Sequence, residues 1–110
     1  MLSIKENGSI YITRGDSAYI TVVVKNGEHV FKPMMGDMLH FSVKKDVDDT
    51  EYIIHKVFQV GDAIVINPED TRNQSFGKYL YDVQLTRPNG EVYTIIEPTL
   101  FYIKEEVTHE

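Results

Sequence analysis

Two short motifs have residue types that chemistry uses. Arg14-Gly15-Asp16 is the tripeptide that integrins recognise, but it also suits a turn, because glycine is free in φ and aspartate bonds nearby backbone. Asp46, Asp48 and Asp49 offer carboxylates to calcium, yet the run lacks the glycine and the distal glutamate of a calcium-binding loop. We therefore interpret the first motif as a turn and the second as a solvated hairpin tip.

His40 and His55 are the candidates for a metal site. Pairing Lys44 with Glu51 across a hairpin sets His40 opposite His55, and two histidines with a third ligand suit zinc. That register places no third histidine or carboxylate nearby, so an exposed cross-strand pair is favoured.

The sequence also has no cysteine, no Gly-x-Ser-x-Gly elbow and no Walker loop. We predict no catalytic residue, no cofactor and no enzyme.

The element that organises the chain is a hairpin from Gly77 to Ile96. Tyr79, Tyr81, Val83 and Leu85 alternate with mostly polar residues, which predicts a strand with one buried face. Pro88-Asn89-Gly90 predicts the turn, which sets Leu85 opposite Tyr93 and Val83 opposite Ile95.

The remaining sequence predicts short strands separated by turn signals. They cover residues 2–5, 9–13, 17–25, 38–45, 51–58, 63–67 and 100–103, with one helical turn at 68–71 and a break at Pro98. In the adopted register, Tyr52 and Ile54 join the core face. The predicted core is Ile20, Val22, Phe41, Val43, Ile64, Ile66, Tyr81, Val83, Leu85 and Phe101. About eight strands without a long helix indicate a sandwich or a barrel.

Length and charge limit the function further. The 110 residues suit one domain, which we place at 1–104, followed by an acidic tail at 105–110. The net charge of −6 argues against a nucleic-acid or anionic-lipid surface. The first residues lack the pattern of a signal peptide, and no apolar run approaches the ~20 residues that span a bilayer.

Several phrases of the sequence together resemble a known family. They are Ile12-Thr-Arg-Gly-Asp-Ser17, Gly36-Asp-Met-Leu-His-Phe-Ser-Val-Lys-Lys45, Ile66-Asn-Pro-Glu-Asp-Thr71, Gly77-Lys-Tyr-Leu-Tyr-Asp-Val-Gln-Leu85 and Thr94-Ile-Ile-Glu-Pro-Thr-Leu-Phe101. In this order they resemble immunoglobulin-like domains in tail and baseplate proteins of phages and prophages of Gram-positive bacteria, notably the amino-terminal domain of the upper baseplate protein family. The resemblance implies an all-β, immunoglobulin-like antiparallel β-sandwich of about eight short strands.

The resemblance also implies a function and a location. The chain is expected to be a non-enzymatic structural or assembly component of a phage or prophage tail or baseplate. Its partners would be other phage structural proteins or a second copy of itself, with no nucleic acid and no membrane. It would occupy the virion, or the cytoplasm of the bacterial host before assembly.

A corner in the chain is similar to the turn before strand F of immunoglobulin domains. Pro68-Glu-Asp-Thr71 followed by Gly77-x-Tyr79 implies that Asp70 and Tyr79 form this corner, with the Tyr79 hydroxyl bonded to backbone near residues 68–71. The chain departs from antibody domains by extra residues before Gly77, by Tyr81 at a cysteine position, and by Phe41 without a strand C tryptophan.

The candidate interface lies in residues 29–35. Val30, Phe31, Met34 and Met35 have no core periodicity, and Pro33 suits a sheet edge, so we expect this segment to meet a partner. The other interpretation is that these residues cap one open end of the sandwich. The alternative is a carbohydrate-binding or adhesive module for a cell-wall glycan, in which Tyr11, Tyr19 and Tyr102 would stack on sugars, although no tryptophan is present.

Overall fold

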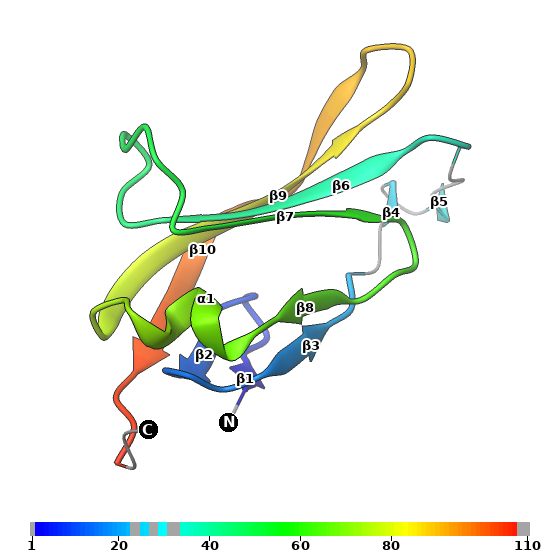
Figure 1. The fold of residues 1–110 in the computed structure, drawn as a ribbon. Helices are drawn as coiled ribbons and strands as arrows, with labels where there is room; N and C mark the ends of the chain where they lie inside the picture. The colour runs from blue at the N-terminus through cyan, green and yellow to red at the C-terminus, as the bar shows by residue number, and fades with distance from the viewer. Residues whose placement is uncertain (1, 23–24, 27–28, 31–33, 108–110) are drawn as a thin grey trace.

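A computed structural model describes residues 2–22, 25–26, 29–30 and 34–107. It is mostly β and has two facing layers (Figure 1). The main sheet has the strand order β1 (Ser3–Ile4), β2 (Ile10–Thr13), β10 (Val92–Lys104), β9 (Gly77–Thr86), β6 (Met38–Lys44) and β7 (Ile54–Gln59). The second layer contains β3 (Ala18–Ile20), β8 (Ile64–Ile66) and helix α1 (Pro68–Arg72). A further hairpin joins β4 (Lys25–Asn26) to β5 (His29–Val30). The all-β prediction is confirmed.

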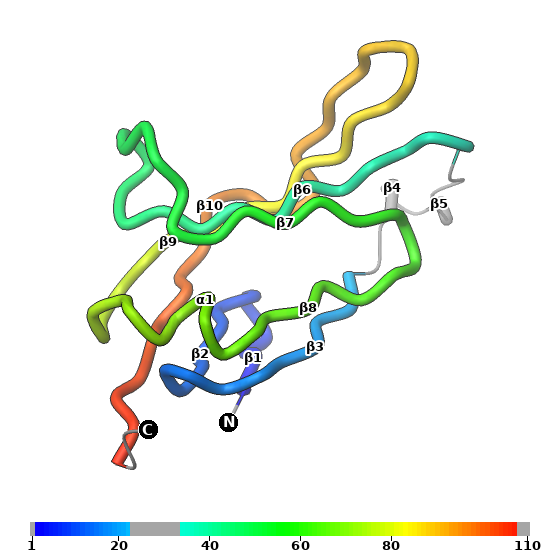
Figure 2. The backbone as a smooth tube through the Cα atoms, in the orientation of Figure 1, coloured from blue at the N-terminus to red at the C-terminus, as the bar shows by residue number. Residues whose placement is uncertain are grey.

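The buried side chains form one core cluster with members from both layers, and the two layers face each other in Figure 2. All ten predicted core residues are buried, because alternate positions of each strand point toward the opposite layer. Phe41 is at the centre of an aromatic group, with ring centroids 5.5 Å from Tyr81 and 6.2 Å from Phe101. The sequence therefore predicted the inner face of both layers.

The organising hairpin forms as predicted at its turn and changes register further along. The amide of Arg87 donates to the Glu91 carbonyl at 2.9 Å, and Leu85 pairs with Tyr93. Val83, however, pairs with Ile96 rather than the predicted Ile95, because β10 shifts register between Thr94 and Ile96.

The predicted break at Pro98 is wrong, since β10 continues through it. A second register shift lies between Ile96 and Thr99 and contains the proline. A bulge leaves a residue out of the ladder, so a proline there removes no required hydrogen bond. The result is one long curved strand that pairs with β9 along its length and, parallel to it, with β2.

The predicted β6–β7 register is wrong by two residues. Ser42 pairs with His55 instead of Ile53, and Val43 pairs with Ile54. This register sets Phe58 opposite Leu39, where the predicted one would have set Lys56, so two buried apolar side chains pair there. Ile54 is on the core face as expected, but Tyr52 lies outside the ladder and is 51% exposed.

The two ends of the main sheet are short or guarded. The edge strand predicted at residues 2–5 is β1, which has only two residues. At the other end Lys56 of β7 bonds Asp70 of α1 at 2.9 Å across the opening between the layers. The strand predicted at 17–25 is shorter than expected, and within the described residues β3 pairs only with β8.

The predicted helical turn is α1. Asp70 in this helix and Tyr79 after it make separate contacts and do not bond each other. Asp70 accepts a hydrogen bond from the Asn67 amide at 2.7 Å, which caps the helix. Tyr79 is buried as expected, and its hydroxyl donates to the Ser75 carbonyl at 2.7 Å. The predicted acceptor near residues 68–71 is wrong, because the extra residues before Gly77 bring the Ser75 carbonyl within reach of the hydroxyl.

Tyr79→Phe is expected to lower the free energy of unfolding by about 1 kcal/mol, the usual net value of one hydrogen bond. Burial raises the pKa of the Tyr79 phenol, in keeping with a hydroxyl held away from water. Urea unfolding of Tyr79→Phe beside Tyr19→Phe, whose ring is 71% exposed, measures the effect. Equal midpoints for the two variants would contradict it.

Candidate functional site

The most prominent surface feature is the far end of the β9–β10 hairpin, residues 86–94, which we call the arm. It extends beyond the core and away from the second layer (Figure 1). Its residues from Pro88 to Thr94 are all exposed, including Val92 at 56% and Tyr93 at 46%. Apolar side chains on a projecting hairpin are available to a partner.

Hydrogen bonds within the arm fix its shape. Glu91 accepts hydrogen bonds from the side chains of Asn89 and Tyr93, and its amide donates to Asn89 Oδ1 at 3.0 Å. The two side-chain donors lower the pKa of the Glu91 carboxyl. The hydrogen bond from Tyr93 to Glu91 in turn raises the pKa of the Tyr93 hydroxyl. The Arg87 guanidinium lies 6.0 Å from the centre of the Tyr93 ring. A loop held in this way loses little conformational entropy on binding.

A second turn packs against the base of the arm. Asp37, whose side chain is 1% exposed, accepts the Met34 amide at 2.7 Å and has its other oxygen 3.9 Å from Arg87 Nε. Arg87 also donates to the Met34 sulfur at 2.7 Å. A Cβ atom built at Gly36 would lie 2.7 Å from Pro88 Cγ, so the turn touches the arm closely. We call the arm and residues 34–37 the arm surface.

The predicted interface residues fall partly on this surface. Met34 is 46% exposed and Met35 98% exposed, and both lie in the turn beside the arm. The backbone of Val30 belongs to β5, but its side chain lies outside the described part, as does Phe31 entirely. The arm itself was not predicted as an interface, although Arg87, Pro88 and Tyr93 belong to the predicted hairpin.

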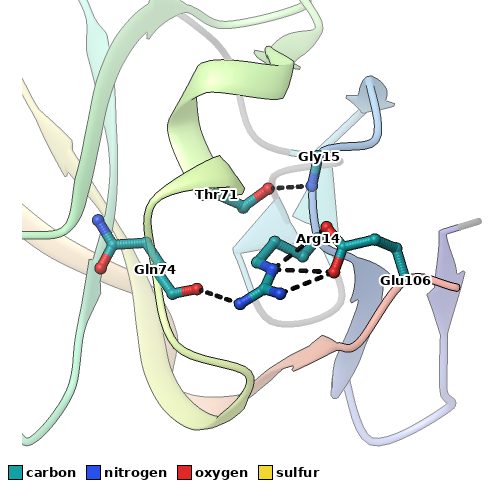
Figure 3. A network of polar contacts seen from close by, with 5 residues as sticks. All are labelled: Arg14, Gly15, Thr71, Gln74 and Glu106. Atoms are coloured by element: carbon teal, nitrogen blue, oxygen red, sulfur yellow. Dashed lines mark hydrogen bonds and ion pairs between the residues drawn. The ribbon is translucent and has the colours of Figure 1, made fainter. Parts of the chain in front are cut away.

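The Arg14-Gly15-Asp16 turn connects three separate segments (Figure 3). The Arg14 guanidinium bonds Glu106 at 2.8 Å and the Gln74 carbonyl at 3.1 Å, and the Glu106 contact raises the arginine pKa. The Gly15 amide donates to Thr71 Oγ1 at 2.8 Å. Because the arginine is held within the fold, the motif acts as a turn. Glu106 lies in the predicted acidic tail, and the boundary at 104 stays a prediction.

The two histidines are diagonal rather than opposite, because the β6–β7 register differs from the predicted one. Their ring centroids are 5.8 Å apart. Among the described residues no group of three histidines or carboxylates is arranged to hold a metal ion. Nor does the described part of the chain contain a helix with the length and apolar character to cross a bilayer.

The three predicted sugar-stacking tyrosines lie on two different sheets. Tyr11 and Tyr102 pair on β2 and β10, with ring centroids 5.7 Å apart. Tyr19 lies on β3, which pairs with β8 in the smaller sheet.

No protein-family model, curated protein or solved structure matches the chain.

Proposed function

We propose that the chain is a non-enzymatic, immunoglobulin-like component of a phage or prophage tail or baseplate, which binds its partner through the arm surface. The observation that carries the binding role is the arm surface itself, where Met35 and Tyr93 are exposed on a hairpin and turn fixed by internal hydrogen bonds. The phage context rests on the sequence resemblance.

The strand order supports the immunoglobulin-like interpretation. Strands β10, β9, β6 and β7 follow the order G, F, C and C′ of a variable-type domain, and β3 and β8 pair as B and E do in the opposite sheet. A buried tyrosine at the start of β9 bonds backbone four residues upstream, as the tyrosine corner does. The second layer has only these two strands among the described residues, which is fewer than in antibody domains.

The chemistry of the arm surface favours a protein partner. Methionine side chains adapt to different shapes, while a tyrosine adds both apolar area and a hydroxyl. Arginine and tyrosine are both enriched at the centres of protein interfaces. Here Arg87 lies against the ring of Tyr93. A rigid hairpin with flexible methionines at its base therefore suits repeated contacts in an assembly.

Met35→Ser is expected to weaken association while leaving stability unchanged, because the side chain is 98% exposed. Val107→Ser is the matched control, since Val107 is also 98% exposed but lies near the carboxyl end of the described chain. Sedimentation equilibrium over a range of concentrations measures self-association, and thermal melting measures stability.

Mass spectrometry of tail particles from an induced culture of the bacterium that carries the gene tests the phage context. The proposal requires this chain in those particles, and its absence would contradict the tail assignment. Equal self-association of Met35→Ser and wild type would exclude the arm surface as the contact between copies of the chain. A melting temperature lowered by Met35→Ser would assign Met35 to the core.

A further inference from the structure

The outer face of the main sheet carries a depression of about 380 Å³, which we call the trough. It lies over strands β6, β7 and β9, and Val47 and Tyr52 of the β6–β7 loop and Pro98 of β10 contribute to its lining. Figure 2 shows that this loop and the arm both rise from the same side of the sheet, opposite the second layer. The volume is within the range of about 300–1,000 Å³ typical of small-molecule sites.

Strand register places complementary polar groups in rows across the floor of the trough. Ser42 of β6 lies between His55 of β7 and Asp82 of β9, and His40 lies beside Gln84. The Ser42 hydroxyl bonds His55 Nδ1 at 2.9 Å, and His40 Nε2 bonds Thr86 Oγ1 at 3.1 Å. The serine and both imidazoles are thus oriented by partners within the protein.

Asp82 and Gln84 differ from these neighbours, because their side chains make no hydrogen bond within the described part of the chain. Asp82 is half-buried, and burial raises the pKa of its carboxyl, while the nearby Lys44 ammonium partly opposes that effect. A partly desolvated carboxylate without a donor is unfavourable unless a ligand supplies one. Because Asp82 and Gln84 lie on the same face of one strand, their side chains can bind two neighbouring hydroxyl groups.

The wall beside these polar groups is aromatic and apolar. The Tyr52 ring stacks on His55 with centroids 4.7 Å apart, and the tyrosine is 51% exposed. Val47 and Pro98 also line the trough and add apolar surface. A ligand that fits has hydroxyl groups toward one side and C–H groups toward the other. A pyranose ring has both.

We propose that the trough binds a neutral saccharide unit, with Asp82 and Gln84 accepting and donating hydrogen bonds to adjacent hydroxyls and Tyr52 contacting the C–H groups of the ring. Charge-assisted hydrogen bonds to the Asp82 carboxylate supply the strongest contacts. An acidic sugar is disfavoured by Asp82 and by the net charge of −6. This site is separate from the arm surface and does not depend on the assembly role.

The test uses the full chain labelled with nitrogen-15 and titrated with glucose, galactose, rhamnose and N-acetylglucosamine, each as the free monosaccharide. At least one sugar is expected to give saturable amide shifts centred on Asp82, Gln84 and Ser42. Asp82→Asn is expected to weaken that sugar about tenfold or more, as for the loss of a charge-assisted hydrogen bond. Asp62→Asn makes the same chemical change at an exposed turn and is expected to bind normally.

Thermal melting separates a binding role for Asp82 from a structural one. The raised pKa means that the folded state disfavours the charged carboxyl, so the protein loses stability as the pH rises through that pKa. Asp82→Asn removes this cost, and we expect a higher melting temperature at neutral pH together with weaker sugar binding. A structural residue would lose stability instead.

Three outcomes would overturn the proposal. They are no saturable shift with any of the four sugars, shifts centred on Tyr11 and Tyr102 instead of the trough, or equal affinity of Asp82→Asn and Asp62→Asn. Tyr52→Ala is a second variant, expected to weaken binding without unfolding because half of its ring is exposed. Met35→Ser is expected to retain sugar binding, so failure of the arm surface and failure of the trough are distinguishable.

Discussion

Phe41→Ala is expected to lower the free energy of unfolding by about 3–5 kcal/mol, a large share of the roughly 5–15 kcal/mol typical of a domain. The side chain is fully buried and packs against the rings of Tyr81 and Phe101. Its removal loses the transfer free energy of the ring and leaves a cavity between two rigid sheets that cannot close around it.

Urea unfolding followed by circular dichroism measures this loss, with Phe76→Ala as the matched control because Phe76 is 52% exposed. Phe41→Leu, which keeps most of the volume, should fall between wild type and alanine. A midpoint for Phe41→Ala close to that of Phe76→Ala would mean that the layers do not pack around Phe41.

The second large effect is expected for Gly36→Ala. Gly36 has φ of +91°, which costs an alanine about 1–2 kcal/mol. The new methyl group would also lie 2.7 Å from Pro88 Cγ, and displacing a ring so close costs about 1–3 kcal/mol more. Unlike the Phe41 change, this one should also move the arm relative to the turn at residues 34–37.

Gly61→Ala is the matched control that measures the backbone cost alone, so the difference from Gly36→Ala gives the cost of the contact with the arm. Gly61 has φ of +98° but no atom within 4 Å of a Cβ, so its alanine variant should show the conformational cost alone. Pro88→Ala combined with Gly36→Ala should recover the difference between the two glycine variants. Equal unfolding free energies for Gly36→Ala and Gly61→Ala would show that the arm does not rest on the turn.

The sequence predicted those parts of the fold that depend on local alternation. The β9 strand, the turn at Pro88-Asn89-Gly90 and the inner positions of β6 and β8 follow from side chains pointing alternately in and out, which holds whatever the strand pairs with. The burial of Tyr79 and the bonding of its hydroxyl to upstream backbone were also predicted. The carbonyl that accepts this hydrogen bond was not, because it depends on how the residues before Gly77 fold.

Long-range pairing could not be predicted in the same way. A two-residue slide of β7 leaves its inner face unchanged, so alternation alone cannot choose between the registers of Ser42 with Ile53 and with His55. The trough depends on that choice, since it brings His55 beside Ser42, and also on the β6–β9 pairing that sets Ser42 beside Asp82. The bulges that carry β10 past Pro98 likewise reflect curvature of the whole sheet.

The ion pair between Lys56 and Asp70 has a consequence for how copies of the domain can meet. Strand β7 ends the main sheet among the described strands, and such an edge can recruit another strand and grow into fibres. Lys56 points inward from this edge and is held there by Asp70, so a second sheet docking on β7 would have to cover a charge. Copies of the domain at high concentration are thus hindered from polymerising through the β7 edge.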